Sequence, residues 1–597
     1  MILRVCDWIA EYAYLQGIVN VHGLMGGGAA GLNDGFIKNK NINYICYHHE
    51  QGAGHAAVGE SKFTGLPSLV NPTTGCGGTN CATSVLNAWQ DSVPVIFISG
   101  NVRLDTCSGW INQQKGLNIR KYGIQEHHVV DTYKSITKFS HFVTSVEEVF
   151  PVIQKAFHIA MDGRKGPVWI DIPADIQLAP ISESYEMYNP QQYEFDIDNI
   201  DTSKIELKIL ESKRPLVLAG YGIRQSSSVE FFKQFINKYN LPFVSTYGAR
   251  DYVNDDNLFS IGAVGQRGSR AGNFALQNAD LLIILGSSLN ASVLGYDPKQ
   301  FSPYSYKIHV DIDSSELNKE IVKTDLKIQQ DLRTFLSKFV DMNDMGRLSH
   351  PYHKIWLDKV NNWKDKWPVI KDVGIDSNEE KINLYSVLET LNTHTNSKHI
   401  LMGDAGSISY AGPVFLRAQK DQRFIFNPAQ ADMGWALPGS IGVSLISNQP
   451  VVSIIGDGSF MSNIQELAVV KQFNLDIKFV ILNNDGYLSI MNTQNKFFEG
   501  RVYGTSKGKG LWFPDFGDVA KSYGIKYHKI ESSKNINEIQ CLLDVEGPII
   551  IDCICVKEQQ ILPSQSFKNG KQAPLHDLVP FLPEDEIKKE IQDRRLL

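Results

Sequence analysis

Short apolar runs recur along the chain and alternate with longer stretches that have a helical period. Each run is apolar at successive positions, which is typical of strands that are buried on both faces. Such strands, separated by helices, form parallel sheets that helices cover on both sides. The sequence therefore predicts an α/β fold. The runs lie at 93–100, 166–173, 214–222, 279–286, 306–313, 450–458, 477–484 and 547–556.

Two polar stretches interrupt this alternation. Residues 184–203 are acidic and lack periodicity, and residues 341–381 are polar with scattered tryptophans. We interpret both as linkers, because 597 residues are too many for one hydrophobic core. "GPVWIDIP" and "GPIIIDCI" close the first and third segments in the same way, which suggests two copies of one fold around a different middle. The predicted divisions are domains at 1–183, 204–340 and 382–560 and a tail at 561–597.

Composition excludes some classes of partner. The net charge of −7 is spread along the sequence and gives no reason to expect nucleic acid or an anionic membrane. The sequence contains no stretch of about 18 uncharged apolar residues, so it predicts no membrane span. Asp7 and Glu11 interrupt the apolar start, which favours a helix of the first domain over a signal peptide. Eight irregularly spaced cysteines favour reduced, mostly buried thiols in a cytoplasmic protein.

The most specific element begins with "VVSIIGDGSF" and reaches "FVILNN" about 25 residues later. A buried strand ends at Gly456-Asp457-Gly458, and the next strand ends at Asn483-Asn484. Neighbouring parallel strands place their carboxyl ends side by side, where open α/β sheets bind ligands. The glycines would let backbone approach a diphosphate, and Asp457 and Asn484 offer the oxygen ligands that Mg²⁺ prefers. The alternative is two unrelated turns.

Here the sequence resembles the thiamine-diphosphate enzymes, in which this Gly-Asp-Gly and Asn-Asn pairing is the signature. It is most similar to the acetolactate synthase and pyruvate decarboxylase group. Further motifs follow in that group's order over about 500 residues: "VNVHGLMGGGAAGLNDGF", "HEQGAGHAAVGESKFTGLP", "GIQEHHVVDTYKSITKFSH", "GDAGSISYAGP" and "QADMGWALPGSIG".

The resemblance implies that the first domain binds the aminopyrimidine ring of thiamine diphosphate and the third binds its diphosphate. Asp457 and Asn484 would hold Mg²⁺ by their side chains, and Gly486 would hold it by its carbonyl. Met433, for which core packing is the alternative, matches the apolar residue that keeps the cofactor bent. The carbonyl of Ala431, where the family usually has Gly, would accept from the 4′-amino group. The other residues assigned to cofactor contact are Gly26, Gly406, Gly456, Gly458, Ser459 and Tyr487.

Glu50 matches the acid that contacts N1′ of the pyrimidine, from where it helps the 4′-amino group to remove the C2 proton. The small residues after it would let the cofactor of another subunit approach, which implies a homodimer or homotetramer. His48, His49 and His55 raise a metal site as an alternative. Adjacent strand residues point to opposite faces, which argues against it. Gln125 matches a glutamine that orients substrate or intermediate, or else it is a surface residue.

Two departures concern substrate and FAD. Acetolactate synthases carry a Trp nine residues beyond the metal-binding Asn, where this chain has Thr493. Their FAD-contacting Arg-Phe-Asp-Asp run is replaced by "GSSLNAS" at 286–292, although Gly220, Gly222 and "GQRGSRAGN" keep the general pattern. The sequence therefore leaves FAD open.

The leading hypothesis is decarboxylation of a 2-keto acid, first of all pyruvate, with transfer of the acyl unit to a carbonyl acceptor. Thiamine diphosphate and Mg²⁺ are the expected cofactors. "NNDGYLSIMNTQ" and "NGKQAPLHDLVPFLPEDE" are similar to acetolactate-synthase-like proteins of surface-polysaccharide pathways, which suggests a keto sugar nucleotide as acceptor. The alternatives are a simple decarboxylase that releases an aldehyde and a degenerate cofactor-binding scaffold.

Overall fold

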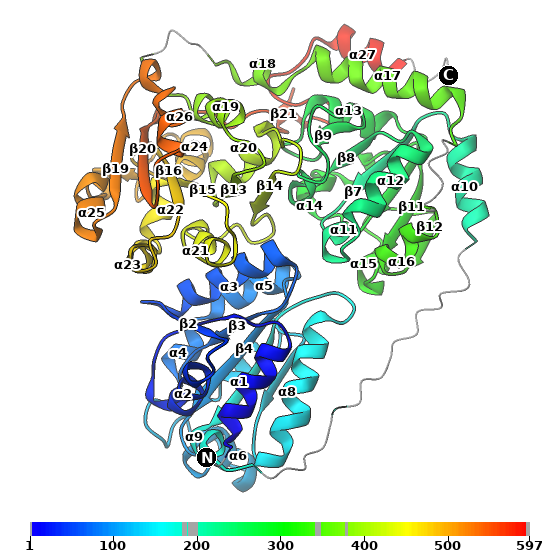
Figure 1. The fold of residues 1–597 in the computed structure, drawn as a ribbon. Helices are drawn as coiled ribbons and strands as arrows, with labels where there is room; N and C mark the ends of the chain where they lie inside the picture. The colour runs from blue at the N-terminus through cyan, green and yellow to red at the C-terminus, as the bar shows by residue number, and fades with distance from the viewer. Residues whose placement is uncertain (1–2, 182–187, 189–200, 341–347, 376–379, 593–597) are drawn as a thin grey trace.

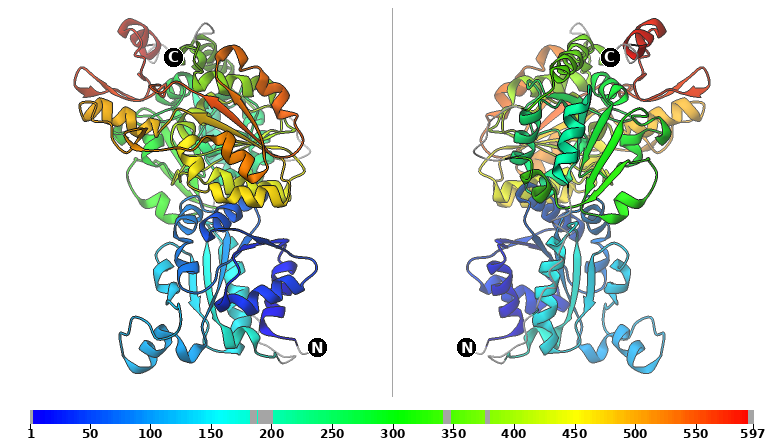
Figure 2. Two further views of the ribbon diagram at one scale, coloured as in Figure 1. Left: turned by 90° about the vertical axis from the view of Figure 1, so that its left-hand side faces the viewer. Right: turned by 90° about the vertical axis from the view of Figure 1, so that its right-hand side faces the viewer.

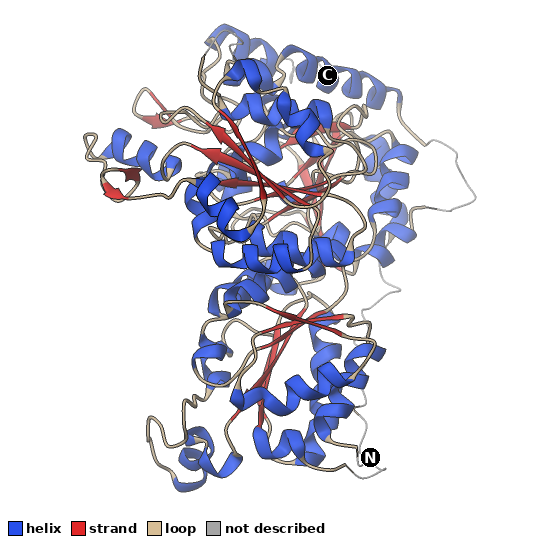
Figure 3. Ribbon diagram, turned by 60° about the vertical axis from the view of Figure 1, so that its left-hand side comes forward, coloured by secondary structure: helices blue, strands red, loops and turns tan. Residues whose placement is uncertain are grey.

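The computed structural model describes residues 3–181, 188, 201–340, 348–375 and 380–592. They form three six-stranded parallel sheets with flanking helices (Figures 1 and 3). The first domain lies below the other two, which sit side by side above it (Figures 1 and 2). All eight apolar runs contain strands, so the predicted α/β class is confirmed.

The first sheet has the order β2-β1-β3-β4-β6-β5. Its strands are β1 (Asn20–Gly23), β2 (Asn43–Cys46), β3 (Ser68–Asn71), β4 (Val95–Asn101), β5 (Phe139–Phe142) and β6 (Val168–Pro173). Helices α1 (Val5–Leu15), α2 (Ala30–Lys38) and α8 (Val146–Met161) pack on one face. Helices α3 (Glu50–Thr64) and α5 (Ala82–Gln90) pack on the other. The predicted first helix is therefore α1.

The third sheet repeats this topology, with the order β14-β13-β15-β16-β20-β19. Its strands are β13 (Ile400–Gly403), β14 (Arg423–Phe426), β15 (Val451–Gly456), β16 (Ile477–Asn483), β19 (Lys526–Ile530) and β20 (Ile549–Ile554). Numbered from the start of each domain, the two orders are identical. The expectation that the first and third domains share one fold is confirmed. Helices α19 (Leu384–His394), α20 (Ser407–Phe415) and α26 (Glu538–Leu543) cover the face away from the first domain.

The central sheet is wound differently, with the order β12-β11-β10-β7-β8-β9. Its strands are β7 (Pro215–Ala219), β8 (Phe243–Ser245), β9 (Ser260–Ala263), β10 (Leu281–Leu285), β11 (Tyr306–Asp311) and β12 (Leu326–Gln329). Helices α12 (Val229–Tyr239), α13 (Arg270–Asn278) and α16 (Leu332–Ser337) contribute to its core. The chain reverses its direction of strand addition between β7 and β10, which makes their carboxyl ends a topological switch point.

One hydrophobic core crosses from the first domain into the third. Ala53, Ala56 and Ala57 of α3 share it with Leu437 and Ile441 of α21 (Ala436–Ile446). The two helices approach so closely that a Cβ added at α3 Gly59 would collide with backbone of α21. The small residues of α3 are therefore fixed by packing within one chain.

The prediction of a linker at 341–381 is wrong for its middle part. Residues 351–373 form α17 (Pro351–Lys366) and α18 (Val369–Val373). Trp356 and Trp363 lie on one face of α17 and are buried in the central core, while its other positions are mostly polar. High average polarity hid this helix from the sequence interpretation. The remaining predicted linker, 184–203, falls largely outside the described residues.

The tail turns back over the central domain. Arg270 of α13 donates to the carbonyl of Leu578 at 3.1 Å, and Arg267 donates to that of Ile561 at 2.9 Å. The last helix, α27 (Glu584–Gln592), places Glu590 beside Lys359 and Trp363 of α17. None of the described helices combines the length and apolar character that crossing a bilayer requires. The eight cysteines are free thiols, five of them buried.

Candidate active site

The Gly-Asp-Gly and Asn-Asn segments meet at one edge of the third sheet. Strands β15 and β16 pair in parallel up to Gly456 and Leu482, so the residues that follow lie side by side. Asp457 opens the short helix α22 (Asp457–Met461) and is buried. Its Oδ2 atom accepts from the backbone N–H groups of Asn484 at 3.1 Å and Gly486 at 3.0 Å. The three expected metal ligands are thus in direct contact.

Among the described residues, the side chain of Asn484 has an unpaired buried oxygen, which is unusual in a folded protein. Its Oδ1 atom is inaccessible and has no hydrogen-bond partner in the described structure. Burial raises the pKa of Asp457 to about 7, although three backbone amides oppose this rise. A buried carboxylate and an orphaned amide oxygen both gain from a cation. The residues present therefore fit a small oxygen-preferring metal such as Mg²⁺.

The two glycines beside Asp457 have different roles. A Cβ at Gly456 would meet nothing, so this position leaves open space at the end of β15. A Cβ at Gly458 would instead collide with the ring of Tyr487. Gly458 therefore makes room for Tyr487, and only Gly456 keeps the open approach that we expected of both. Gly406, which caps α20 at the end of β13 with a φ of 67°, also faces open space.

The segment 430–434 lies between the two cofactor-binding domains. Ala431 has a φ of 55°, a left-handed backbone that costs an L-residue energy. This explains why glycine suits the position. The neighbouring Met433 leaves 40% of its surface exposed, so it is not a core residue. Buried Asp404 accepts from the amides of Gly434 at 3.0 Å and Ala436 at 2.9 Å, and also receives a hydrogen bond from Ser459.

Glu50 opens α3 in the first domain and is buried. Asn80 donates to its Oε2 atom at 2.9 Å, and a Cβ at Gly77 would stand 3.1 Å from its Oε1 atom. The Thr73 hydroxyl nearby is buried without a described partner. Gly26 packs against Thr73 so closely that a Cβ would overlap it. Gly26 and Glu50 therefore border one corner of the first domain.

The backbone of Gln125 packs against the segment 73–80, which also contacts Glu50. A Cβ at Gly75 would collide with the carbonyl oxygen of Gln125. Gln125 is exposed and has a φ of 57°, and such strain in a non-glycine residue gathers at functional sites. The segment 73–80 therefore connects Gln125 with Glu50.

Two expectations about the Glu50 segment are corrected. His48 and His49 do not lie in a strand: they form the turn between β2 and α3, where the His49 ring caps the helix by accepting from Gln51 N–H at 3.1 Å. The small residues of α3 do not border open space for a cofactor. A Cβ at Gly52 would stand 2.5 Å from Glu466, and one at Gly54 would collide with Ser84, both in the same chain. His55 is fully buried in this helix, as packing predicts.

The Glu50 carboxylate makes no polar contact with the Asp457 edge of its own chain, within the described residues: no hydrogen bond or ion pair links it with Asp457, Asn484 or Met433. Large apolar side chains are also exposed in both domains. They include Met25, Tyr122 and Ile124 in the first domain, and Met433, Ile490 and Trp512 in the third.

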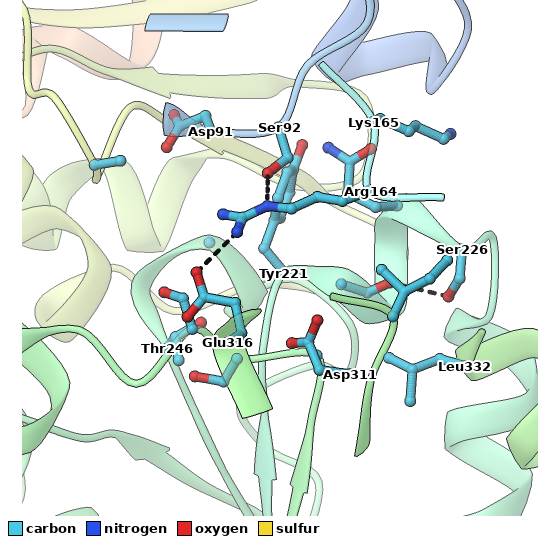
Figure 4. A pocket seen from close by; sticks show the side chains of 18 of the residues that line it. Asp91, Ser92, Arg164, Lys165, Tyr221, Ser226, Thr246, Asp311, Glu316 and Leu332 are labelled. Carbon is cyan, nitrogen blue, oxygen red and sulfur yellow. Dashed lines mark hydrogen bonds and ion pairs between the residues drawn. The ribbon is translucent and has the colours of Figure 1, made fainter. Parts of the chain in front are cut away.

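A cavity of about 400 Å³ lies where the three domains meet (Figure 4). Its floor is the switch point of the central sheet, with Tyr221, Gly286 and Asp311 at the strand ends. Arg164 enters from the first domain and donates to Ser92 at 2.9 Å and to Glu316 at 2.8 Å. Burial raises the pKa of Asp311 to about 6.

Sequence reasoning missed three residues that organise the site: Asn80, Asp404 and Glu466. Asp404 had a signal, because it directly follows a buried strand that ends in glycine, as Asp457 does. Asn80 and Glu466 gave none, since their partners lie 30 and 418 residues away.

The comparisons with known proteins cover the whole architecture. Models of thiamine pyrophosphate enzymes match as an N-terminal TPP-binding domain over residues 3–130, a central domain over 203–339 and a C-terminal TPP-binding domain over 404–553. The acetolactate synthase large subunit of Lactococcus lactis is 29% identical, over 92% of each chain. The Escherichia coli isozyme 2 large subunit is 28% identical, over 91% of this chain and 94% of its own. Chloroplastic acetolactate synthase of Arabidopsis thaliana is 29% identical, over 93% and 82%. The chain belongs to the thiamine-diphosphate-dependent enzymes and is a carboligase or decarboxylase similar to acetolactate synthases.

Proposed function

We propose that this enzyme binds thiamine diphosphate with Mg²⁺, decarboxylates a 2-keto acid such as pyruvate and transfers the acyl unit to a carbonyl acceptor. The observation that carries the proposal is the orphaned Oδ1 atom of Asn484, a residue whose backbone N–H donates to the carboxylate of Asp457. Both groups lie at the carboxyl edge of a parallel sheet, where a diphosphate-bound metal would satisfy them.

When bound, thiamine diphosphate supplies the electron sink for decarboxylation. In this proposal Asp457, Asn484 and the carbonyl of Gly486 hold the metal, and the open space at Gly456 receives the diphosphate. The Ala431 carbonyl would accept from the 4′-amino group, and Met433 would support the cofactor. Glu50 holds a proton at N1′ of the ring, which requires an acid that is shielded from water and oriented, as Asn80 orients it.

We infer that a second copy of the chain completes each site. Among the described residues Glu50 has no polar contact with Asp457 or Asn484 of its own chain, and exposed apolar side chains border each group along the sequence. A twofold dimer would bring the Glu50 corner of one copy to the Asp457 edge of the other and would cover both borders. Size measurement by light scattering distinguishes this dimer from a tetramer and from a monomer.

We infer a large acceptor substrate from the small side chain of Thr493. This residue lies on α24 (Leu488–Phe497), is exposed and replaces the Trp that acetolactate synthases carry. A small side chain leaves room for a large acceptor, and a keto sugar nucleotide is our first candidate. Products of pyruvate alone, and of pyruvate with a second 2-keto acid, an aldehyde or a keto sugar nucleotide, should be analysed by mass spectrometry. A coupled product supports the proposal, whereas free aldehyde in every mixture supports the simple decarboxylase.

The central cavity is a candidate binding site for FAD. It occupies the switch point at which open α/β sheets bind nucleotides, and Asp311 ends the strand next to β10, where an acid can accept from ribose hydroxyls. We infer a nucleotide site here, with FAD as the first ligand to test. Flavin absorbance of the purified protein and of its denatured supernatant reads occupancy directly. A protein that stays colourless after incubation with FAD would exclude it.

A further inference from the structure

We propose that Glu466 is a positioning residue that fixes the turn before Glu50 and so directs the Glu50 carboxyl group toward N1′ of the cofactor. The inference rests on the proposed role of Glu50. It adds a residue of the third domain to a task that the sequence assigned to the first domain alone.

The contact geometry connects Glu466 with the start of α3. Glu466 ends the 3₁₀ turn η6 (Ile464–Glu466), nine residues after Asp457, and is fully buried. Its Oε2 atom accepts from the backbone N–H of His48 at 3.1 Å, and its carboxylate also accepts from the amide of His49. Its Oε1 atom stands where a Cβ at Gly52 would be 2.5 Å away. The carboxylate therefore contacts both sides of Glu50 along the chain.

The charge arrangement is costly without such a role. Among the described residues no Lys or Arg pairs with Glu466, and the Glu50 carboxylate lies nearby. Burial raises the pKa of Glu466 to about 7, and the backbone amides and Gln465 oppose this rise only in part. An apolar side chain would fill the space at lower cost. Buried acids with a strongly raised pKa are concentrated at functional sites of proteins.

The turn that Glu466 holds determines where Glu50 points. His49 is extended at φ −151° and ψ 141°, and the helix begins at the next residue. A shift of this turn would move the Glu50 carboxyl group relative to Asn80, its described hydrogen-bond partner. A misplacement of about 1 Å in a catalytic group can lower a rate by about 100-fold.

The test measures the proton-transfer step that depends on Glu50, in the absence of substrate. Deuterium exchange at C2 of thiamine diphosphate bound to the holoenzyme is followed by NMR after an acid quench. We expect Glu466→Ala to slow this exchange by about 10- to 100-fold, while the dissociation constant of the cofactor changes by less than about threefold. Glu466→Gln keeps an oxygen that can accept from His48 and should recover most of the rate. Glu538→Gln, at a partly exposed acid of the same domain, is the control.

Three results would overturn the proposal. One is exchange in Glu466→Ala as fast as in Glu538→Gln. Another is an equal loss when Glu466→Ala is added to Glu50→Gln, because residues that act through one another are not additive. If Glu466→Ala does not fold, Gly52→Ala replaces it, since its methyl group would displace the Glu466 carboxylate; unchanged exchange there also overturns the idea. Wild-type exchange in Glu50→Gln alone would instead refute the proposed function of Glu50.

Discussion

Asn87 of the first domain donates a hydrogen bond of 2.6 Å to the Oδ2 atom of Asp432 in the third. Asp432 stands between Ala431 and Met433, the two residues expected to contact the cofactor ring, and it also accepts from Asn427 at 3.0 Å. Burial raises the pKa of Asp432 to about 6, against these hydrogen bonds. The segment 430–434 is therefore held by contacts between two domains of one chain.

Removing the carboxylate of Asp457 should weaken cofactor binding without unfolding the protein. We expect Asp457→Asn to weaken binding of thiamine diphosphate with Mg²⁺ by about 100-fold or more. Loss of a residue that only hydrogen-bonds to a metal ligand already lowers metal affinity by about 10- to 100-fold. The cofactor-dependent rise in melting temperature should disappear, as it should on addition of EDTA to the wild type. Asp485→Asn is the matched control, since its side chain faces Lys507 and Lys557. An undiminished thermal shift in Asp457→Asn would contradict the metal assignment.

Glu50→Gln should separate catalysis from binding. The amide keeps the size of the side chain and an oxygen for Asn80 but cannot hold the transferable proton. We expect turnover to fall by about 100- to 10,000-fold, with cofactor affinity nearly unchanged. Steady-state kinetics and calorimetric titration measure the two effects. The exposed acid of α8 provides the control Glu147→Gln, and a Glu50→Gln enzyme as active as that control would remove Glu50 from the mechanism.

Ala431→Gly should stabilise the protein. The left-handed φ of 55° costs an L-residue about 1–2 kcal/mol, and glycine avoids this strain but loses more entropy on folding. The balance predicts a gain of about 0.5–1 kcal/mol in the free energy of unfolding. Chemical denaturation of the cofactor-free protein measures it. Ala429→Gly, two residues earlier, should destabilise or have no effect; a loss of stability in Ala431→Gly would show that the strain is absent.

Asp171 should make stability depend on pH. It is fully buried, and burial raises its pKa from 3.8 to about 7, while Ser99 and Asn101 donate to it and oppose the rise. The native state then holds a proton that the unfolded state has released. The free energy of unfolding should fall as pH rises from about 4 to about 7, by at most about 1.4 kcal/mol per pH unit. Asp171→Asn should flatten this decline in melting scans, and exposed Asp105→Asn should not. Equal slopes in the two variants would refute the assignment.

Thr493→Trp should narrow the acceptor range. The position is exposed on α24, so the protein should fold normally. We expect the rate with a bulky acceptor to fall by about tenfold or more relative to the rate with pyruvate as acceptor, because a ring removes volume that only the large acceptor needs. Competition between the two acceptors in one mixture gives this ratio. Thr493→Ser is the conservative control, and a ratio unchanged by Trp would place the acceptor elsewhere.

The sequence predicted the sheets and the proximity of Asp457 to Asn484 because both depend on local patterns. Apolar runs locate the strands, and parallel pairing then brings Asp457 beside Asn484. Contacts between distant segments left no such pattern. The partnership of Glu466 with the His48 amide and the strained backbone of Ala431 become visible only in three dimensions. The helix that carries Trp356 and Trp363 was missed because only one face is apolar.

The matching strand orders of the first and third sheets give the two half-sites a common plan. Gly26 follows the first strand of one domain as Gly406 follows that of the other. After the second strands come Glu50 in one and Ala431 and Met433 in the other. The third and fourth strands lead to Thr73 and Asn101 in the first domain and to Asp457 and Asn484 in the third. Under the proposed function, the Glu50 corner and the Asp457 edge would thus be two specialisations of equivalent strand ends on a shared scaffold.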